Sequence, residues 1–230
     1  MGVPVPDATQ WHQIEGVADC AHPVFKHWEK LAAQGEVIYQ DDTPVRILSL
    51  IEENQQADPP ARTGRYTTGL IVQVGEQQIC RYYAGRQQAG ENLAAPLRKR
   101  EPQRAKPLVM SDALASNAAE EQTLIRCHCL AHGQRKFRDL DEDFPGESAV
   151  VTQVLRQGFE HDEEARVRQL SAAARLAYHQ TYSGPLLDGL KEWLEQQGTE
   201  RTVEPNSSLG QALAYLLGHW KTLTRFSTAS

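Results

Sequence analysis

Two acidic positions follow short runs of apolar, β-prone residues. Asp41, with its neighbour Asp42, comes after residues 37–39, and Asp112 comes after residues 108–110. Side chains at strand ends in α/β sheets project from a rigid scaffold into a crevice where ligands collect. Paired carboxylates repel each other, and a divalent cation such as Mg²⁺ relieves that repulsion while binding oxygen ligands. Two such ions can stabilise the attacking and leaving oxygens of a phosphoryl transfer. The alternative is that each aspartate caps a turn or a helix.

A second group of reactive side chains lies in the segment CHCLAHGQRKF, residues 127–137. Cys127, His128, Cys129 and His132 have the donor types of a zinc site, but structural zinc usually uses two ligand pairs, and no second pair has finger-like spacing. Alternation along a strand would also send His128 to the side opposite the two cysteines. A Cys–His nucleophile pair is a further alternative, without any oxyanion-hole motif. The pattern favours a strand that runs into a helix.

Basic residues gather in two places that could contact phosphate groups. The first cluster consists of Arg98, Lys99, Arg100, Arg104 and Lys106, and the second consists of Arg135, Lys136 and Arg138. Acidic residues concentrate elsewhere, at 139–143 and 160–164. This separation would let a chain with a net charge of -6 present a basic face to DNA. The alternative is that both clusters form ordinary solvated surface.

Length and composition indicate a soluble globular protein. The chain has 230 residues, of which 40% are hydrophobic and 23% are charged, enough for one large domain or for one core with a sizeable insertion. No apolar run approaches the roughly 20 residues that cross a bilayer, and the N-terminus lacks the pattern of a secretory signal. Four cysteines without paired spacing predict reduced thiols in a cytoplasmic protein.

Periodicity predicts helices at both ends of the chain. Residues 7–34 are predicted to be largely helical and to be divided in two by Pro23. The apolar residues of this stretch recur at steps of three and four and are Trp11, Ile14, Val17, Val24, Trp28 and Leu31. From Glu147 onward the pattern is helical throughout, with separate helical stretches near 170–177 and 186–198. A last helix is predicted to start after a cap at 205–208.

The middle of the chain carries the predicted strands. Residues 67–74 and 78–83 are predicted to form an antiparallel hairpin around a turn at 75–76. Further short strands are expected at 36–39, 107–110 and 123–127, with helices at 89–99 and 130–140 and a polar loop at 52–64. The order of elements predicts an α/β sheet core followed by an α-helical block.

Five segments resemble, in order, the catalytic region of transposases of the insertion-sequence-66 family. They are YQDDTPVRIL, LVMSDAL, CHCLAHGQRKF, YSGPLLDGLKEWL and NSSLGQALAYLLGHWKTLTRF, and the resemblance runs from about residue 5 to residue 226. The first two segments resemble the family's two aspartate motifs, which implies catalytic roles for Asp41 and Asp112 and leaves Asp42 as a neighbour. The resemblance of the third segment implies that Cys129 and His132 are a signature pair that packs or positions groups near the active site.

The resemblance also implies an architecture, a cofactor and partners. It implies a ribonuclease-H-like mixed sheet whose Asp-Asp-Glu triad binds Mg²⁺ or Mn²⁺ and cleaves and transfers DNA strands. The expected organisation is an N-terminal helical segment at 1–34, a ribonuclease-H-like core at 35–144, a helical insertion at 145–204 and a C-terminal helix at 205–230. The expected partners are DNA, through the two basic clusters, and other copies of the chain in a homo-oligomer, with no membrane.

The chain departs from the family's pattern at its third acid. In the family this glutamate lies in an Asp-Asn-Asn…Glu segment beyond the last helix, whereas Ser-Thr-Ala-Ser follows Phe226 here and Glu204 lies before that helix. We therefore expect a truncated catalytic fragment that binds metal weakly and has little or no activity alone, because in-line attack loses a metal ligand. The alternative function is a non-catalytic DNA-binding or dimerising remnant of a mobile element.

Overall fold

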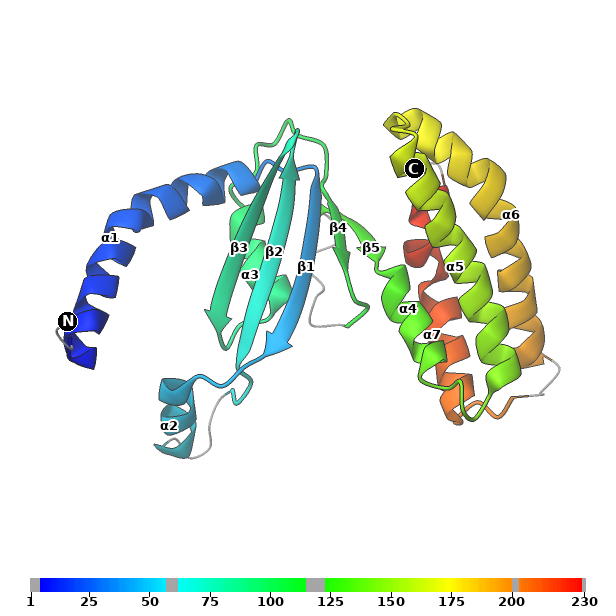
Figure 1. Cartoon of the computed structure of the whole chain (residues 1–230), viewed down its shortest axis with the longest axis horizontal. Helices are drawn as coiled ribbons and strands as arrows, with labels where there is room; N and C mark the ends of the chain where they lie inside the picture. Colours follow the sequence, from blue (N-terminus) through cyan, green and yellow to red (C-terminus); the bar gives the residue numbers. More distant parts are fainter. Residues whose placement is uncertain (1–4, 57–61, 115–122, 200–202, 229–230) are drawn as a thin grey trace. The chain divides into compact units, whose positions relative to one another are not determined.

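The computed structural model describes residues 5–56, 62–114, 123–199 and 203–228 (Figure 1). The chain divides into two compact units. The first consists of Met1–Met110 and Leu114–Ile125, and the second consists of Ser111–Ala113 and Arg126–Ser230. Asp41 and Asp42 therefore belong to the first unit and Asp112 to the second. The domain boundaries predicted at 34, 144 and 204 remain predictions.

The strands form a mixed five-stranded sheet, which confirms the predicted α/β class. The strands are β1 (Val37–Pro44), β2 (Tyr66–Val74), β3 (Gln77–Gly85), β4 (Leu108–Ser111) and β5 (Ile125–His128), in the order β3-β2-β1-β4-β5. β2 pairs antiparallel with both β1 and β3. β1 pairs parallel with β4, and in this register Tyr39 lies opposite Met110.

The β2–β3 hairpin is confirmed where its turn residues predicted it. Gly75 has a φ of 57°, a left-handed conformation that costs glycine little. Its N–H also donates to the carboxylate of Glu36 at 3.2 Å. The turn thereby fixes the register in which Asp41 lies opposite Gly69 on β2 and Gly69 lies opposite Tyr82 on β3.

Helices α1 (Asp7–Ala32) and α3 (Ala89–Leu97) pack on one face of this sheet. In Figure 1, α3 lies behind the strands β1 to β3. Alternate residues of β1 and β2 form the core beneath the helices, and the cluster contains Ala32, Ile38, Leu70, Val72, Leu93, Val109 and Leu124. The residues between them in the strands point to the opposite face, where Tyr39, Ile71 and Tyr82 are exposed.

Two predictions for the first unit are wrong. Pro23 lies inside one continuous helix, α1, because proline removes one i→i−4 bond and bends a helix without always ending it; Figure 1 shows α1 curving. Residues 52–56, predicted as loop, belong to α2 (Leu48–Gln56), while 57–61 lie outside the described residues. The guanidinium of Arg86 donates to Glu53 at 2.9 Å and to Asn54 at 2.5 Å, so a residue distant in sequence holds this polar helix.

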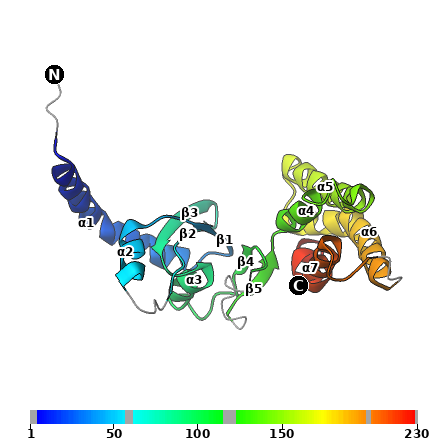
Figure 2. The same ribbon diagram turned by 90° about the horizontal axis from the view of Figure 1, so that it is seen from below.

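Helices α4 (Leu130–Arg138), α5 (Pro145–Val167), α6 (Ala172–Thr199) and α7 (Ser208–Leu223) make up the second unit (Figure 2). A short 3-10 helix, η3 (Arg225–Ser227), follows α7. The core between them includes Phe137, Leu155, Leu194 and Leu216, all fully buried. The stretches predicted near 170–177 and 186–198 form the single helix α6, which contains Pro185.

The start of α7 is confirmed as a capped helix terminus. The hydroxyl of Ser207 accepts a hydrogen bond from the N–H of Gly210 at 3.0 Å. α7 also packs against α4. Gly133 of α4 lies so close to α7 that an added Cβ would be 2.8 Å from the side chain of Leu216. None of the helices that the structure describes is long and apolar enough to cross a membrane.

Candidate active site around the aspartates

Asp41 and Asp42 lie within β1 rather than after it, because the strand continues to Pro44. Consecutive residues of a strand point to opposite faces, so the two carboxylates have different surroundings. Asp42 faces the helices. One of its oxygens accepts a hydrogen bond from the hydroxyl of Thr68 at 2.5 Å, and the other accepts from the N–H of Ala89 at 2.8 Å.

The carboxylate of Asp42 therefore helps to hold the N-terminus of α3. Ala89 is the first residue of that helix, and its N–H would otherwise lack an intrahelical partner. A negative charge there also interacts favourably with the helix dipole. Asn92 extends the network by donating to the hydroxyl of Thr68 at 2.8 Å, and both residues are buried. These bonds assign Asp42 a structural role.

Asp41 projects from the opposite, open face of the sheet. It is exposed, and one of its oxygens accepts a short-range hydrogen bond from the N–H of Asp42 at 3.0 Å. Its register partner on β2 is Gly69, which has no side chain to cover the carboxylate. On the far side of Gly69, its register partner on β3 is Tyr82. The Tyr82 ring lies 3.6 Å from the position that a Cβ on Gly69 would occupy. Of the two neighbouring acids, Asp41 is the one placed to bind a ligand.

Asp112 directly follows β4 and is partly buried in the second unit. The adjacent N–H, that of Ala113, donates to the hydroxyl of Tyr215 on α7. Burial raises the pKa of Tyr215, the negative charge of Asp112 raises it further, and the bond from Ala113 opposes this rise. Tyr215 is thus a protonated phenol close to Asp112 at neutral pH.

His128 lies at the end of β5 and is buried, and the charge of Asp112 affects its pKa. Thr222 donates its single hydroxyl hydrogen to the carbonyl of His219 at 2.8 Å, so the 2.9 Å contact between Thr222 and His128 requires His128 Nδ1 to be the donor. Burial lowers the pKa of His128 to about 4, and the nearby His219 and Arg126 add to this effect while Asp112 opposes it. His128 is therefore neutral near pH 7, with its lone pair on Nε2.

Sequence reasoning missed the contribution of α7 to this region. The ring of His219 packs edge-on against His128 with centroids 4.8 Å apart, and against Tyr215 at 5.0 Å. Tyr215, His219 and Thr222 are spaced by four and three residues, which places them on one side of a helix. That spacing was a readable signal, but nothing in the sequence connected it to Asp112.

The cysteines of the CHCLAHGQRKF segment lie at the predicted junction of strand and helix. The N–H of Cys129 donates to the carbonyl of Ser111 at 2.8 Å, which places Cys129 beside the residue preceding Asp112. Cys127 is buried, and burial raises the pKa of its thiol, so it is a poor nucleophile. Among the residues that the structure describes, Nδ1 of His132 is buried without a hydrogen-bond partner. In the part of the chain that the structure describes, no group of three or more Cys, His, Asp or Glu side chains is arranged to hold a metal ion.

The first basic cluster is partly engaged in holding the fold. Lys99 forms an ion pair with the buried Glu29 of α1. Arg100 donates to the carbonyls of Ala33 and Gly35, each at 2.8 Å, and thereby fixes the connection from α1 to β1. The remaining members, Arg98, Arg104 and Lys106, are exposed. Their contact with DNA remains a prediction.

The second basic cluster lies in the last turn of α4, where cations favour the helix dipole. Arg135 and Lys136 are both exposed. The ammonium of Lys136 lies 4.5 Å from the centre of the Tyr215 ring, a cation–π contact. Lys136 is therefore held in the same neighbourhood as Tyr215 and Asp112, where a phosphate group would meet a positive charge.

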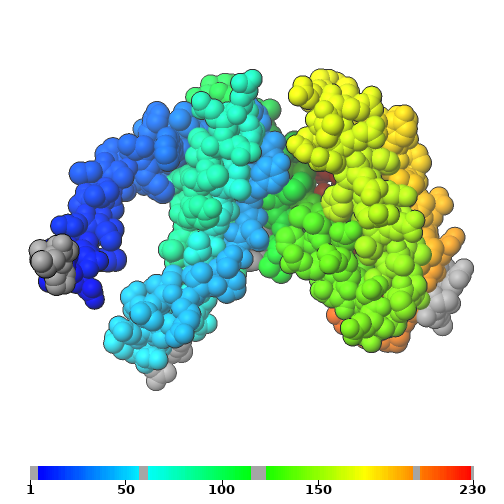
Figure 3. Space-filling view, viewed as in Figure 1, coloured from blue at the N-terminus to red at the C-terminus, as the bar shows by residue number. Residues whose placement is uncertain are grey.

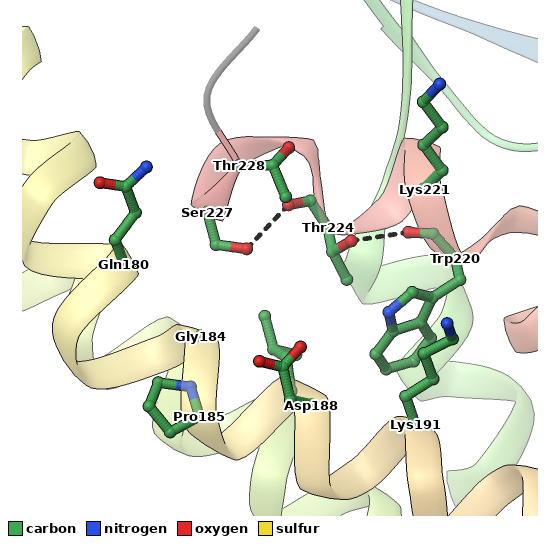
Figure 4. A pocket seen from close by; sticks show the side chains of 11 residues that line it. Gln180, Gly184, Pro185, Asp188, Lys191, Trp220, Lys221, Thr224, Ser227 and Thr228 are labelled. Carbon is green, nitrogen blue, oxygen red and sulfur yellow. Dashed lines mark hydrogen bonds between the residues drawn. The ribbon is translucent and has the colours of Figure 1, made fainter.

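A pocket of about 460 Å³ between α6, α7 and η3 is a separate feature of the second unit (Figure 4). Part of its polar lining is bonded within the helices themselves. Thr224 donates to the carbonyl of Trp220, and Ser227 donates to the carbonyl of Thr224, both at 2.8 Å. Lys191 forms an ion pair with Glu195 at 3.6 Å. Trp220 packs against the helical core. We assign this pocket no role.

Comparison with known protein families gives the class of protein. The chain matches the family model described as Transposase IS66 family over residues 1–230. It belongs to this family, which confirms the resemblance, and DNA is accordingly the partner class of its family. A search of curated proteins found no match to the chain.

Proposed function

We propose that Asp41 and Asp112 are the metal-binding carboxylates of a transposase catalytic region built on a ribonuclease-H-like sheet. The observation that carries the proposal is the different surroundings of the two neighbouring acids of β1. Asp42 is bound by Thr68 and Ala89, whereas Asp41 faces solvent beside a glycine. The acid that the family motif assigns to catalysis is thus the one that the fold leaves available.

The two aspartate motifs occur at β1 and directly after β4, the strand that pairs parallel with β1. Asp41 lies two residues beyond Tyr39, and Asp112 lies two residues beyond Met110, the parallel partner of Tyr39. The order β3-β2-β1-β4-β5, with β1 in the middle, supports the ribonuclease-H-like assignment.

The donor set fits Mg²⁺ or Mn²⁺. Carboxylate oxygens are hard ligands of the kind that both ions bind, and Asp41 offers them on an open face. When bound, such an ion supplies positive charge to a phosphodiester and to its attacking oxygen. Two carboxylates leave most of the coordination shell to water, so we expect weak binding.

The groups around Asp112 would position DNA. Lys136, held over the Tyr215 ring, would bind a backbone phosphate oxygen. His128 is neutral near pH 7 and adds no positive charge that would compete with a metal ion for Asp112. Arg135 and the exposed members of the first cluster, Arg98, Arg104 and Lys106, would extend the contact with the phosphate backbone.

We further propose that this polypeptide alone has little or no strand-transfer activity. Its 230 residues contain no counterpart of the family's Asp-Asn-Asn…Glu segment. Two carboxylates position the attacking and leaving oxygens less well than three. A nicking or strand-transfer assay with Mg²⁺ tests this directly, because turnover that Asp112→Ala abolishes would contradict it.

DNA binding with and without Mg²⁺ separates the proposal from a non-catalytic remnant. We expect Mg²⁺ to strengthen the binding of a labelled duplex to the wild-type chain and to leave binding by Asp41→Asn unchanged. Fluorescence anisotropy at constant ionic strength measures both. Binding that ignores Mg²⁺ and Asp41 alike would favour the remnant.

A further inference from the structure

Helix α1 has one face that packs on its own unit. Near its C-terminal end, Glu29 and Ala32 are buried, and Glu29 forms an ion pair with the buried Arg81 of β3 at 3.4 Å. The guanidinium of Arg81 also lies 4.3 Å from the centre of the Phe25 ring. These contacts account for one face of the last two turns and leave the rest of the helix uncovered.

A second face of α1 carries a continuous exposed apolar seam. Its large members are 38% to 70% exposed, and they extend over most of the helix. They are Trp11, Ile14, Val17, Val24, Trp28 and Leu31, with the exposed Ala21 between Val17 and Val24. Figure 3 shows the N-terminal part of the helix projecting from the strands of the first unit.

The spacing of the seam is that of a coiled coil. From Ile14 to Leu31 the steps are three, four, three, four and three, which places the residues at alternating a and d positions of a heptad. Between Trp11 and Gln34 the a, d, e and g positions contain no Asp, Glu, Lys or Arg. The charged residues of this stretch occupy the other positions and are Glu15, Asp19, Lys26, Glu29 and Lys30.

We propose that this seam pairs with the same seam of a second copy of the chain. The exposed parts of its side chains amount to roughly 600 Å², near the upper limit for an apolar patch on a monomer and close to the ~800 Å² that each partner contributes to a standard interface. Two copies of an uncharged seam can pair without electrostatic repulsion. A different partner that binds through charge would find no opposite charge on this seam. The heptad spacing specifies a helix as the occupant.

Side-chain volumes favour an antiparallel pair. With the helices crossing between residues 22 and 23, the a positions meet the d positions of the second copy, so that Trp28 meets Val17, Leu31 meets Ile14 and Val24 meets Ala21. The large Trp28 indole then lies against a smaller aliphatic side chain, so no layer holds two indoles. A parallel pair would instead place the two Trp28 indoles in one layer and the valines in others.

The molar mass in solution tests the dimer. We expect the wild-type chain, 25.7 kDa as a monomer, to sediment as a dimer at micromolar concentrations. Val17→Glu buries a charge in the seam and is expected to give a monomer with the same far-UV circular dichroism. The matched control Gly16→Glu adds the same charge one residue away, off the seam, where a side chain has open space, and should remain a dimer. A wild-type monomer at 100 µM or a dimeric Val17→Glu would overturn the proposal.

Cross-linking tests the antiparallel arrangement. Cys20 is exposed, occupies a g position and lies near the centre of the seam, so antiparallel pairing places it next to its equivalent. In a Cys80→Ser background, a short bismaleimide should link the two Cys20 residues. A second variant combines Gln13→Cys, also at a g position, with Cys20→Ser and Cys80→Ser. Its two thiols at position 13 lie about 28 Å apart along the axis of the antiparallel pair, beyond the reach of the reagent. Equal cross-linking at both positions would overturn this arrangement.

Discussion

The hydroxyl of Thr68 donates to the carboxylate of Asp42 at 2.5 Å, and this bond distinguishes two adjacent aspartates. Asp42 is held between β2 and the first turn of α3, while Asp41 emerges on the other face. One member of the pair stabilises the fold, and the other remains available for chemistry. This relationship predicts opposite phenotypes for two substitutions of the same kind at consecutive residues.

Asp42→Asn is expected to lower the free energy of unfolding by about 1–3 kcal/mol, because the amide keeps only one acceptor oxygen for the two donors, Thr68 and Ala89, and its –NH₂ group faces the other. Urea unfolding followed by circular dichroism measures the change. Asp41→Asn is the matched control and should stay within about 0.5 kcal/mol of the wild type. An equal decrease in the free energy of unfolding in the two variants would contradict a structural role for Asp42 alone.

Glu29→Gln is expected to cost about 3–5 kcal/mol, because it removes the negative partner of Arg81, whose guanidinium is buried. The ion pair with Lys99 is lost as well. Glu15→Gln, on an exposed part of the same helix, is the control and should have little effect. A Glu29→Gln protein as stable as this control would show that the buried pair does not contribute to stability.

His128 predicts a pH dependence in the acid range. Burial, His219 and Arg126 lower its folded-state pKa to about 4, below the ordinary value of about 6.5, so the unfolded state takes up a proton first as the pH falls. Its contribution is therefore complete above about pH 6.5 and is lost progressively towards pH 4. The full difference is on the order of 3 kcal/mol.

The difference between the wild type and His128→Gln isolates this effect from the carboxylates that titrate in the same window. Urea unfolding from pH 4 to pH 7.5, without divalent cations, should show a shallower pH dependence for the variant. Parallel curves would contradict the assignment of a neutral, buried His128.

Lys136→Gln is expected to weaken duplex DNA binding several-fold and to reduce the slope of log affinity against log salt by about one, because one phosphate contact is lost. Lys191→Gln removes a cation that is paired with Glu195 on α6 and is the control. Anisotropy titrations at several salt concentrations measure both variants. An unchanged salt slope for Lys136→Gln would exclude Lys136 from the DNA contact.

Local signals in the sequence predicted much of the fold. Gly75 predicted the hairpin turn through its own left-handed backbone conformation, and Ser207 predicted the start of α7 through a bond to a residue three positions along. The prediction failed at α2, which Arg86 holds from about 30 residues away, and at Pro23, where the helix tolerates a missing bond. Distant side chains decide such cases.

The candidate site was predicted only in part for the same reason. The motifs pointed to Asp41 and Asp112, but spacing could not distinguish Asp41 from Asp42, because the distinction depends on Thr68 and Ala89. The neighbours of Asp112 on α7, above all Tyr215, are about 100 residues away in sequence. Such neighbours become visible only when the chain is folded.

Mn²⁺ binding followed by electron paramagnetic resonance tests the central claim most directly. Titration of the wild type, Asp41→Asn, Asp42→Asn and Asp112→Asn, each confirmed as folded, should show weak binding by the wild type and by Asp42→Asn. Binding should be lost in Asp41→Asn and Asp112→Asn. Binding that survives in Asp41→Asn but disappears in Asp42→Asn would contradict the assignment of Asp41 as the metal ligand.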